Sequence, residues 1–223
     1  MTHLAAAIQM TSGSDKAANL EKAEHLIRLA AARGAKFVAL PEVFNWRGKR
    51  TEEPAAAESL EGATLTLMAG LARELEIHLL PGSITEHVPG ESRRYNTSVL
   101  IGPEGETLAS YRKIHLFDID VPGLEHLKES KAVKRGESVV VAESPAGRIG
   151  LSICYDVRFP ELYRRLTREG ARVLAIPSAF TDRTGRTIGR SSCVRAPSRT
   201  WPTCSHPRRP AITARAAPRT ATR

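Results

Sequence analysis

Residues 148–162 of the chain are RIGLSICYDVRFPEL, a stretch that places a cysteine between an expected strand and an expected helix. Its first half carries a large apolar residue at every second position: Ile149, Leu151 and Ile153. This alternation is typical of a buried strand. Pro160 suits the first turn of a helix, and Gly170 can end that helix in a left-handed conformation. The pattern predicts a strand, a tight turn at Cys154 and a helix.

A cysteine in such a turn is a candidate nucleophile. The thiol of Cys154 would face the free N–H groups and the positive end of the following helix, which lower a cysteine pKa and favour the thiolate. The alternative is a buried, unreactive cysteine, because free cysteine is among the residues most often buried. The other two cysteines of the chain are Cys193 and Cys204. The three cysteines show neither CxxC spacing nor the regular spacing of a disulfide framework, as expected in a reducing compartment.

Length and hydropathy predict a single soluble domain. The chain has 223 residues, 41% of them hydrophobic, which is enough for one substantial core. No apolar run approaches the roughly 20 residues of a membrane span, and no secretory signal opens the chain. We therefore expect a cytoplasmic protein.

The net charge of +9 is unevenly distributed. Residues 1–182 contain 23 basic and 24 acidic groups, whereas residues 183–223 contain ten arginines and no acidic residue. Hydrophobic periodicity also stops after Thr184, and five prolines between 197 and 218 disfavour helices and central strands. This composition predicts a disordered basic tail.

The chain before this tail alternates between the two kinds of periodicity. We expect helices at 15–33, at 63–76 and from 160, and strands at 4–9, 37–41, 77–81, 95–101, 107–112, 139–142, 148–153 and 172–176. The turn at 102–105, Gly-Pro-Glu-Gly, predicts a hairpin rather than a phosphate-binding loop. The order indicates an α/β fold, a mixed sheet with helices on its faces.

Three chemically useful residues follow expected strands: Glu42, Lys113 and Cys154. Strand ends are where α/β folds gather their sites. A thiolate that attacks an amide or nitrile carbon needs a base for its proton and a donor for the developing negative charge. Glu42 could be the base, with Lys113 and the Tyr155 N–H as donors. The alternatives are an exposed loop carboxylate and an ordinary surface lysine.

Three segments in order carry a resemblance to a known family. They are LPE at 40–42, YRKIHLFD at 111–118 and CYDVRFPEL at 154–162. They are similar to the three catalytic motifs of the nitrilase superfamily of carbon–nitrogen hydrolases. DIDVPG at 118–123 most resembles the Nit branch, which contains deaminated glutathione amidases and ω-amidases. The resemblance covers residues 3 to about 187.

The resemblance implies an α-β-β-α sandwich and a Glu-Lys-Cys triad. In it, Glu42 is the general base, Lys113 stabilises the tetrahedral intermediate and Cys154 forms an acyl thioester. Glu129 matches a second glutamate that orients the lysine. The implied activity is an amidase acting on a small carboxylate-bearing amide, and the implied assembly is a homodimer. Two neighbours of the cysteine are further candidates: Tyr155 for support and Arg158 for the substrate carboxylate. No metal or organic cofactor is required.

Other kinds of site remain open. A Cys–His pair could use His115, which lies two residues after Lys113, although the sequence offers no evident partner to orient it. The seven histidines lack zinc-ligand spacing. Within the same superfamily, nitrile or N-carbamoyl hydrolysis is the alternative reaction, and Arg158 could equally be a structural ion-pair partner.

The match to the family ends near residue 186. Codons for Thr200-Trp201-Pro202-Thr203, shifted by one base, permit Asn-Leu-Ala-Tyr, and the same frame restores family-like sequence across 188–223. We therefore expect a truncated hydrolase domain at 1–186, an incomplete sandwich and a frameshifted, disordered tail at 187–223. The rival interpretations are a genuine basic tail that binds nucleic acid, against which the near-absence of aromatics argues, and an inactive remnant.

Overall fold

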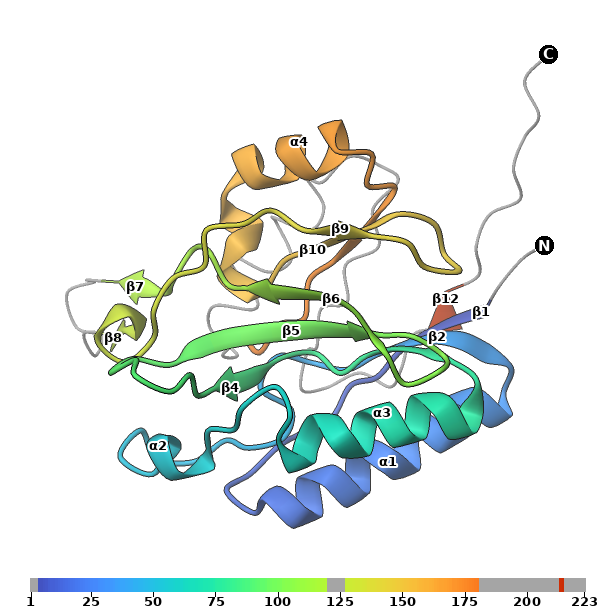
Figure 1. Cartoon of the computed structure of the whole chain (residues 1–223), viewed down its shortest axis with the longest axis horizontal. Coiled ribbons are helices and arrows are strands. Elements are labelled where there is room, and N and C mark those ends of the chain that lie inside the picture. Colours follow the sequence, from blue (N-terminus) through green and yellow to red (C-terminus); the bar gives the residue numbers. More distant parts are fainter. Residues whose placement is uncertain (1–3, 120–126, 181–212, 215–223) are drawn as a thin grey trace.

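The computed structural model describes residues 4–119, 127–180 and 213–214. Its helices are α1 (Lys16–Ala32), α2 (Glu53–Ala56), α3 (Ala63–Leu75) and α4 (Pro160–Arg168), with 3₁₀ turns η1 (Glu129–Lys131) and η2 (Cys154–Arg158). Its strands are β1 (Leu4–Ala7), β2 (Ala35–Ala39), β3 (His78–Leu80), β4 (Ile84–Glu86), β5 (Tyr95–Ile101), β6 (Thr107–Arg112), β7 (Asp118–Ile119), β8 (Leu127–Lys128), β9 (Val141–Ala142), β10 (Ile149–Leu151), β11 (Val173–Ala175) and β12 (Thr213–Ala214). These elements form four layers, helix on sheet on sheet on helix (Figure 1).

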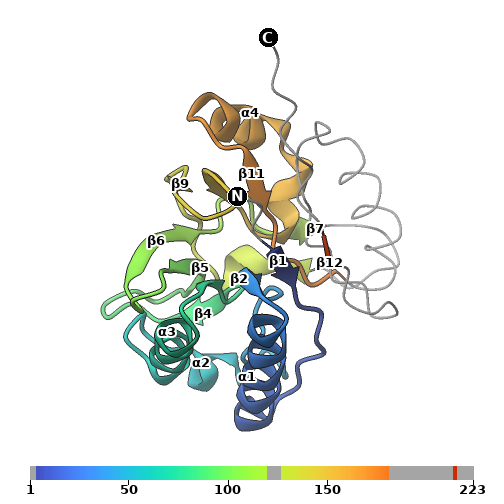
Figure 2. The same ribbon diagram turned by 90° about the vertical axis from the view of Figure 1, so that its right-hand side faces the viewer.

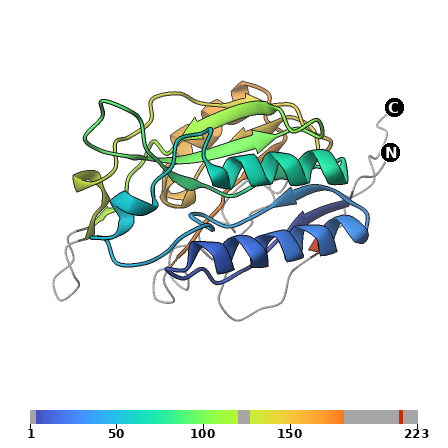
Figure 3. The same cartoon turned by 60° about the horizontal axis from the view of Figure 1, so that its bottom comes forward.

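The larger sheet has the order β12-β1-β2-β3-β5-β4, with β6 also paired to β5. Helices α1 and α3 lie side by side on its outer face (Figure 3). The alternation of β2 explains how the sheet serves two cores: Val38 packs with these helices, whereas Phe37 and Ala39 pack with the second sheet. A strand buried on both faces must be apolar throughout, as the sequence of β2 largely is.

The second sheet has the order β11-β10-β9, and α4 covers its outer side (Figure 2). Ile149, Leu151 and Ile153 face the first sheet and form the core between the sheets. Gly150 points the other way, where an added Cβ would lie 3.0 Å from Leu166 of α4. The small residue therefore allows α4 to approach the strand closely. The predicted α-β-β-α sandwich is confirmed.

The expected elements agree with the structure where the sequence pattern is long. Strands β5 and β6 have the expected bounds, and Gly105, at φ 80°, occupies the turn of their hairpin. Several short features were missed, namely α2, β4, the β7–β8 pair and the two 3₁₀ turns. Strand β4 spans only three residues, two of them polar, so that its pairing with β5 determines its conformation more than its own pattern does.

Two residues of the predicted disordered tail are described, and the disorder expected for 187–223 stays a prediction. Thr213 and Ala214 form β12, which pairs antiparallel with β1. Strand β2 occupies one edge of β1, and the backbone groups of the other edge are available to β12. This pairing uses backbone groups, so the side-chain pattern of the sequence gave no sign of it. The remainder of 187–223 lies outside the described residues, as do Cys193 and Cys204. Among the helices described, none is long and apolar enough to cross a membrane.

Candidate active site

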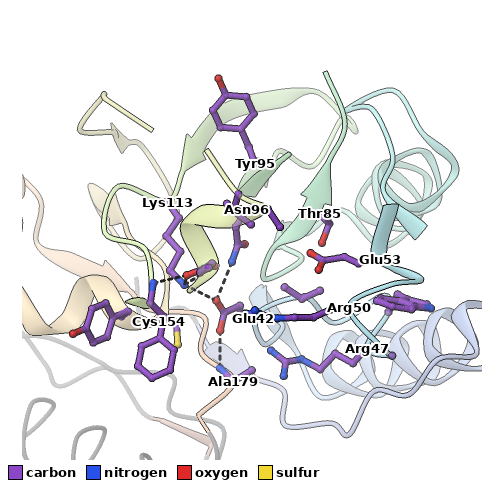
Figure 4. A pocket seen from close by; sticks show the side chains of 18 of the residues that line it. Glu42, Arg47, Arg50, Glu53, Thr85, Tyr95, Asn96, Lys113, Cys154 and Ala179 are labelled. Atoms are coloured by element: carbon purple, nitrogen blue, oxygen red, sulfur yellow. Dashed lines mark hydrogen bonds and ion pairs between the residues drawn. The ribbon is translucent and has the colours of Figure 1, made fainter. Parts of the chain in front are cut away.

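The predicted triad and the predicted second glutamate line one cavity of about 310 Å³: Glu42, Lys113, Cys154 and Glu129. They come from separate elements, and Figure 4 labels three of them, Glu42, Lys113 and Cys154. Glu42 lies just after β2, Lys113 directly follows β6, Glu129 begins η1 and Cys154 begins η2. The remaining wall includes aromatic and basic side chains, among them Trp46, Arg47, Arg50, Tyr95, Phe117, Tyr155 and Phe180.

The Glu42 carboxylate is held on both oxygens. Its Oε1 accepts from Asn96 Nδ2 at 2.9 Å and lies 3.2 Å from Lys113 Nζ, while its Oε2 accepts from the Ala179 N–H at 3.0 Å. Burial acts to raise the pKa of Glu42, but the charges of Lys113 and Arg47 and a hydrogen bond with the Cys154 thiol lower it below its ordinary 4.5. The group is therefore an ionised carboxylate at neutral pH, able to accept a proton.

Lys113 is a buried cation between two carboxylates. Its Nζ lies 3.0 and 3.2 Å from the two oxygens of Glu129, in addition to its contact with Glu42. Glu129 is itself fixed by the Phe117 N–H, 2.6 Å from Oε2. Burial acts to lower the pKa of Lys113, but Glu42 and Glu129 raise it above its ordinary value. The ammonium consequently stays charged, although burial alone would favour the neutral amine.

The thiol of Cys154 differs from the sequence-based expectation. Burial and the negative charge of Glu42 raise its pKa well above 9, and the opposing effects of Lys113 and the Ala179 N–H are smaller. The expected low pKa was wrong because η2, a short 3₁₀ turn, precedes α4, and because Glu42 lies against the sulfur. At neutral pH, the site holds a neutral thiol hydrogen-bonded to a carboxylate.

Cys154 also adopts an unusual backbone conformation. Its φ is 48°, a left-handed value that is uncommon outside glycine, and its N–H donates to Pro177 O at 2.9 Å. Val43, directly after Glu42, has φ 47° and donates its N–H to Ser83 Oγ at 3.1 Å. Such conformations persist where the surrounding contacts enforce them, and they often occur at functional sites.

Gly82 allows the chain to pass closely beneath the Glu42 turn. Its φ is 58°, and an added Cβ would lie 1.7 Å from the carbonyl oxygen of Pro41, the residue before Glu42. Its own carbonyl accepts from Ser98 Oγ at 2.6 Å. A side chain here would have to displace the segment that carries the carboxylate.

Gly82→Ala is therefore expected to lower the free energy of unfolding by about 2–4 kcal/mol, through backbone strain and collision with Pro41. Gly90→Ala is the matched control, because Gly90 has φ 82° with nothing within 4 Å of an added Cβ. It should cost only about 1 kcal/mol, the conformational part alone. Denaturant unfolding measures both, and equal losses in the two variants would contradict this explanation.

The two further candidates lie differently. Tyr155 lines the cavity, and among the described residues its N–H has no hydrogen-bond partner. Arg158 is exposed at the end of η2 and is not among the residues that line the cavity.

Two other arginines line the cavity instead. Arg47 and Arg50 supply the guanidinium groups that face the carboxylate of Glu42 (Figure 4).

His115 has the orienting partner that the sequence did not reveal. Its Nδ1 lies 2.7 Å from Asp156 Oδ1, and its ring stacks on Phe159 at 3.7 Å. The pairing arises because η2 is adjacent to the end of β6 in space. His115 is not among the cavity-lining residues, so this partner does not bring it to the thiol.

Sequence reasoning missed Asn96, Arg47, Arg50 and the Ala179 N–H. The residue patterns around them gave no catalytic signal, because each contributes only through the tertiary position of Glu42 or of the cavity wall. Within 4–119, 127–180 and 213–214, no three His, Cys, Asp or Glu side chains are grouped so as to hold a metal ion.

Comparison with known sequences gives a consistent set of relatives. The carbon–nitrogen hydrolase family profile matches residues 4–204, while the predicted boundary at 186 stays a prediction. A deaminated glutathione amidase from Synechocystis is 46% identical over 187 residues, 82% of this chain and 69% of that protein. The human ω-amidase is 43% identical over 180 residues, 81% of this chain and 64% of that protein. The chain thus spans about two thirds of the length of these relatives.

Solved structures show the same likeness. The NitFhit protein of Caenorhabditis elegans has a TM-score of 0.82 at 34% identity, covering 93% of this chain and 53% of that one. The Nit3 protein of Saccharomyces cerevisiae, from branch 10 of the nitrilase superfamily, has 0.75 at 31%, covering 86% and 72%. A mutant of an amidase from Nesterenkonia, with the acetamide moiety of fluoroacetamide added covalently at the active-site cysteine, has a TM-score of 0.71 at 28% identity, covering 86% of this chain and 72% of that one.

Proposed function

Because the chain belongs to the carbon–nitrogen hydrolase family, we propose that it hydrolyses a small carboxylate-bearing amide through an acyl thioester on Cys154. The observation that supports this most strongly is the placement of the Glu42 carboxylate, the Cys154 thiol and the buried Lys113 ammonium around one cavity. These are the base, the nucleophile and the cation that acyl transfer from an amide needs.

In the first step, Glu42 takes the proton of Cys154 as the sulfur attacks the amide carbon. The resting charges support this assignment, because the pKa of the thiol is raised by burial and by Glu42, while that of Glu42 is lowered by Lys113 and Arg47 against the effect of burial. A neutral thiol beside an ionised carboxylate needs the base to act during attack, as in general base catalysis.

The developing negative charge falls on the former carbonyl oxygen. Lys113 Nζ and the N–H of Tyr155 are its donors, and a buried ammonium acts strongly on such a charge because solvent does not screen it. Glu42 then gives its proton to the amide nitrogen, the C–N bond breaks and ammonia leaves. The acyl group stays on the sulfur as a thioester.

Water completes the reaction. Glu42, again a carboxylate, takes a proton from a water molecule while the oxygen of that water attacks the thioester carbon. The C–S bond breaks, the acid product leaves and the sulfur regains a proton from Glu42. Over both steps, one amide and one water become one carboxylic acid and one ammonia, and every group of the enzyme returns to its starting state.

The cavity supports a small, anionic substrate. Its volume of about 310 Å³ is at the lower end for ligand pockets. Arg47 and Arg50 line the same cavity and can bind a carboxylate, because guanidinium groups bind carboxylates in a two-pronged geometry. The relatives named as deaminated glutathione amidase and ω-amidase favour an amide over a nitrile or N-carbamoyl group.

Ammonia release by the full chain tests this function. We expect hydrolysis of the monoamide of succinic acid with a kcat/KM about tenfold above that of butyramide, which lacks the carboxylate, and no release from butyronitrile. One ordered carboxylate–guanidinium pair accounts for a difference of that size. Turnover of the nitrile alone, or a preference for the uncharged amide, would contradict the proposal.

A further inference from the structure

Asp156 carries a buried carboxylate that no step of the proposed reaction uses. It is 0% exposed. Its Oδ2 accepts from Tyr111 OH at 2.7 Å and from the Ile153 N–H at 2.8 Å. Its Oδ1 accepts from the His115 N–H at 3.0 Å and lies 2.7 Å from His115 Nδ1. Both oxygens are thus occupied by partners from two segments of the chain.

These partners come from both sides of the proposed site. Ile153 directly precedes the nucleophile Cys154. Tyr111 and His115 flank Lys113, each two residues away, at the end of β6. The carboxylate therefore joins the turn that carries the thiol, in one sheet, to the strand that carries the ammonium, in the other.

The thiol turn depends on such support. Cys154 has φ 48°, a conformation that surrounding contacts must enforce. Asp156 closes the turn in both directions, because its own N–H donates to Ile153 O at 3.0 Å while its Oδ2 accepts from the Ile153 N–H. The stacking of Phe159, at the end of η2, on the ring of His115 adds a second contact between the two segments.

We propose that Asp156 is a positioning residue that fixes the Cys154 turn relative to Lys113. This inference rests on the proposed function, in which sulfur and Nζ must reach the same carbonyl group. A displacement of about 1 Å is enough to slow such a reaction by about 100-fold. Asp156 contacts neither the cavity nor the reacting atoms, so that its effect passes through the backbone and the side chains it holds.

Asp156→Asn tests this role. The amide places an NH₂ group against one pair of donors, and we expect kcat to fall by about 10–100-fold with KM within about threefold of the wild type. The control is Glu58→Gln, a partly buried carboxylate with a side chain 13% exposed, which binds Lys16 and Thr64 and lies outside the cavity. Its kcat should stay within about twofold even where its melting temperature falls, because the contacts it loses do not reach the site.

Two variants of His115 separate positioning from chemistry. Asparagine places an NH₂ near the position of Nδ1, so that His115→Asn keeps a hydrogen-bonding group beside Asp156, whereas His115→Ala removes it. We expect His115→Ala to lower kcat about tenfold and His115→Asn to restore most of that loss. Melting temperatures of all variants are measured alongside, so that a loss of folding is seen as such.

Several results would overturn the inference. They are an unchanged kcat in Asp156→Asn, or a rise in KM alone in that variant. Equal losses of kcat in His115→Ala and His115→Asn would also overturn it, because they would point to a chemical role for the ring. The rate at which iodoacetamide alkylates Cys154 is measured in the same proteins. It should rise several-fold in Asp156→Asn, because a displaced turn takes the sulfur away from burial and from Glu42, the two causes of its raised pKa. The alkylation rate can be measured without turnover. A wild type that hydrolyses no amide would therefore contradict the proposed function, while the alkylation rates would still test the positioning role.

Discussion

Cys154→Ala is expected to lower kcat/KM for the succinic monoamide by about 10⁴-fold or more, because no other group near Glu42 can accept the acyl group. The sulfur is the only nucleophile in contact with that carboxylate among the described residues. Removing it leaves Lys113 and the Tyr155 N–H able to polarise a carbonyl, so that a small residual rate over water should persist. Ammonia release followed over hours measures both the loss of activity and the small residual rate.

Cys193→Ala and Cys204→Ala are the controls for loss of a thiol elsewhere in the chain, and each should keep activity within about twofold. Thermal unfolding of Cys154→Ala should show a folded protein, because alanine fits the space of the thiol. Hydrolysis that continued at the wild-type rate in a folded Cys154→Ala protein would exclude the covalent mechanism.

Glu42→Gln is expected to reduce amide hydrolysis by about 10³-fold while making the thiol more acidic. The first effect follows from loss of the base. The second follows from the charges around sulfur: burial and the carboxylate of Glu42 raise the pKa of Cys154, and Lys113 lowers it. With the carboxylate gone and the ammonium still present, the pKa of the thiol must fall.

The pH dependence of Cys154 alkylation by iodoacetamide measures this change. In the wild type, alkylation should rise only above pH 9, since the pKa lies well above that value. In Glu42→Gln, the rise should begin at lower pH. Glu53→Gln, another carboxylate in the cavity wall, should shift the profile less, because Glu53 is not among the leading causes of the thiol's raised pKa. A profile that moved upward in Glu42→Gln would show that the carboxylate does not act on the thiol as described.

Those parts of the fold with a repeating pattern could be predicted from the sequence. The bounds of β5 and β6 were correct because apolar alternation and the turn at 102–105 define both ends. Glu42, Lys113 and Cys154 could be singled out because each follows an apolar run, and the three motifs gave their order. The structure brings all three to one cavity.

The rest depends on contacts between distant segments. Asp156 and His115 are 41 residues apart, and neither carries a local sign of the other. Likewise, the pKa of Cys154 is set by burial and by Glu42, 112 residues earlier in the chain, so that reasoning from the nearby helix gave the wrong direction. Strand β4 and the β12 pairing with β1 also result from the neighbouring strands rather than from their own sequence.

Mass spectrometry of the protein quenched in acid during turnover tests the central claim most directly. With the succinic monoamide as substrate, the account predicts a protein heavier by one succinyl group, with the addition mapped to the peptide that contains Cys154 and absent from Cys154→Ala. Turnover with no covalent species at any quench time, combined with an active Cys154→Ala protein, or an acyl group mapped to another residue, would contradict it.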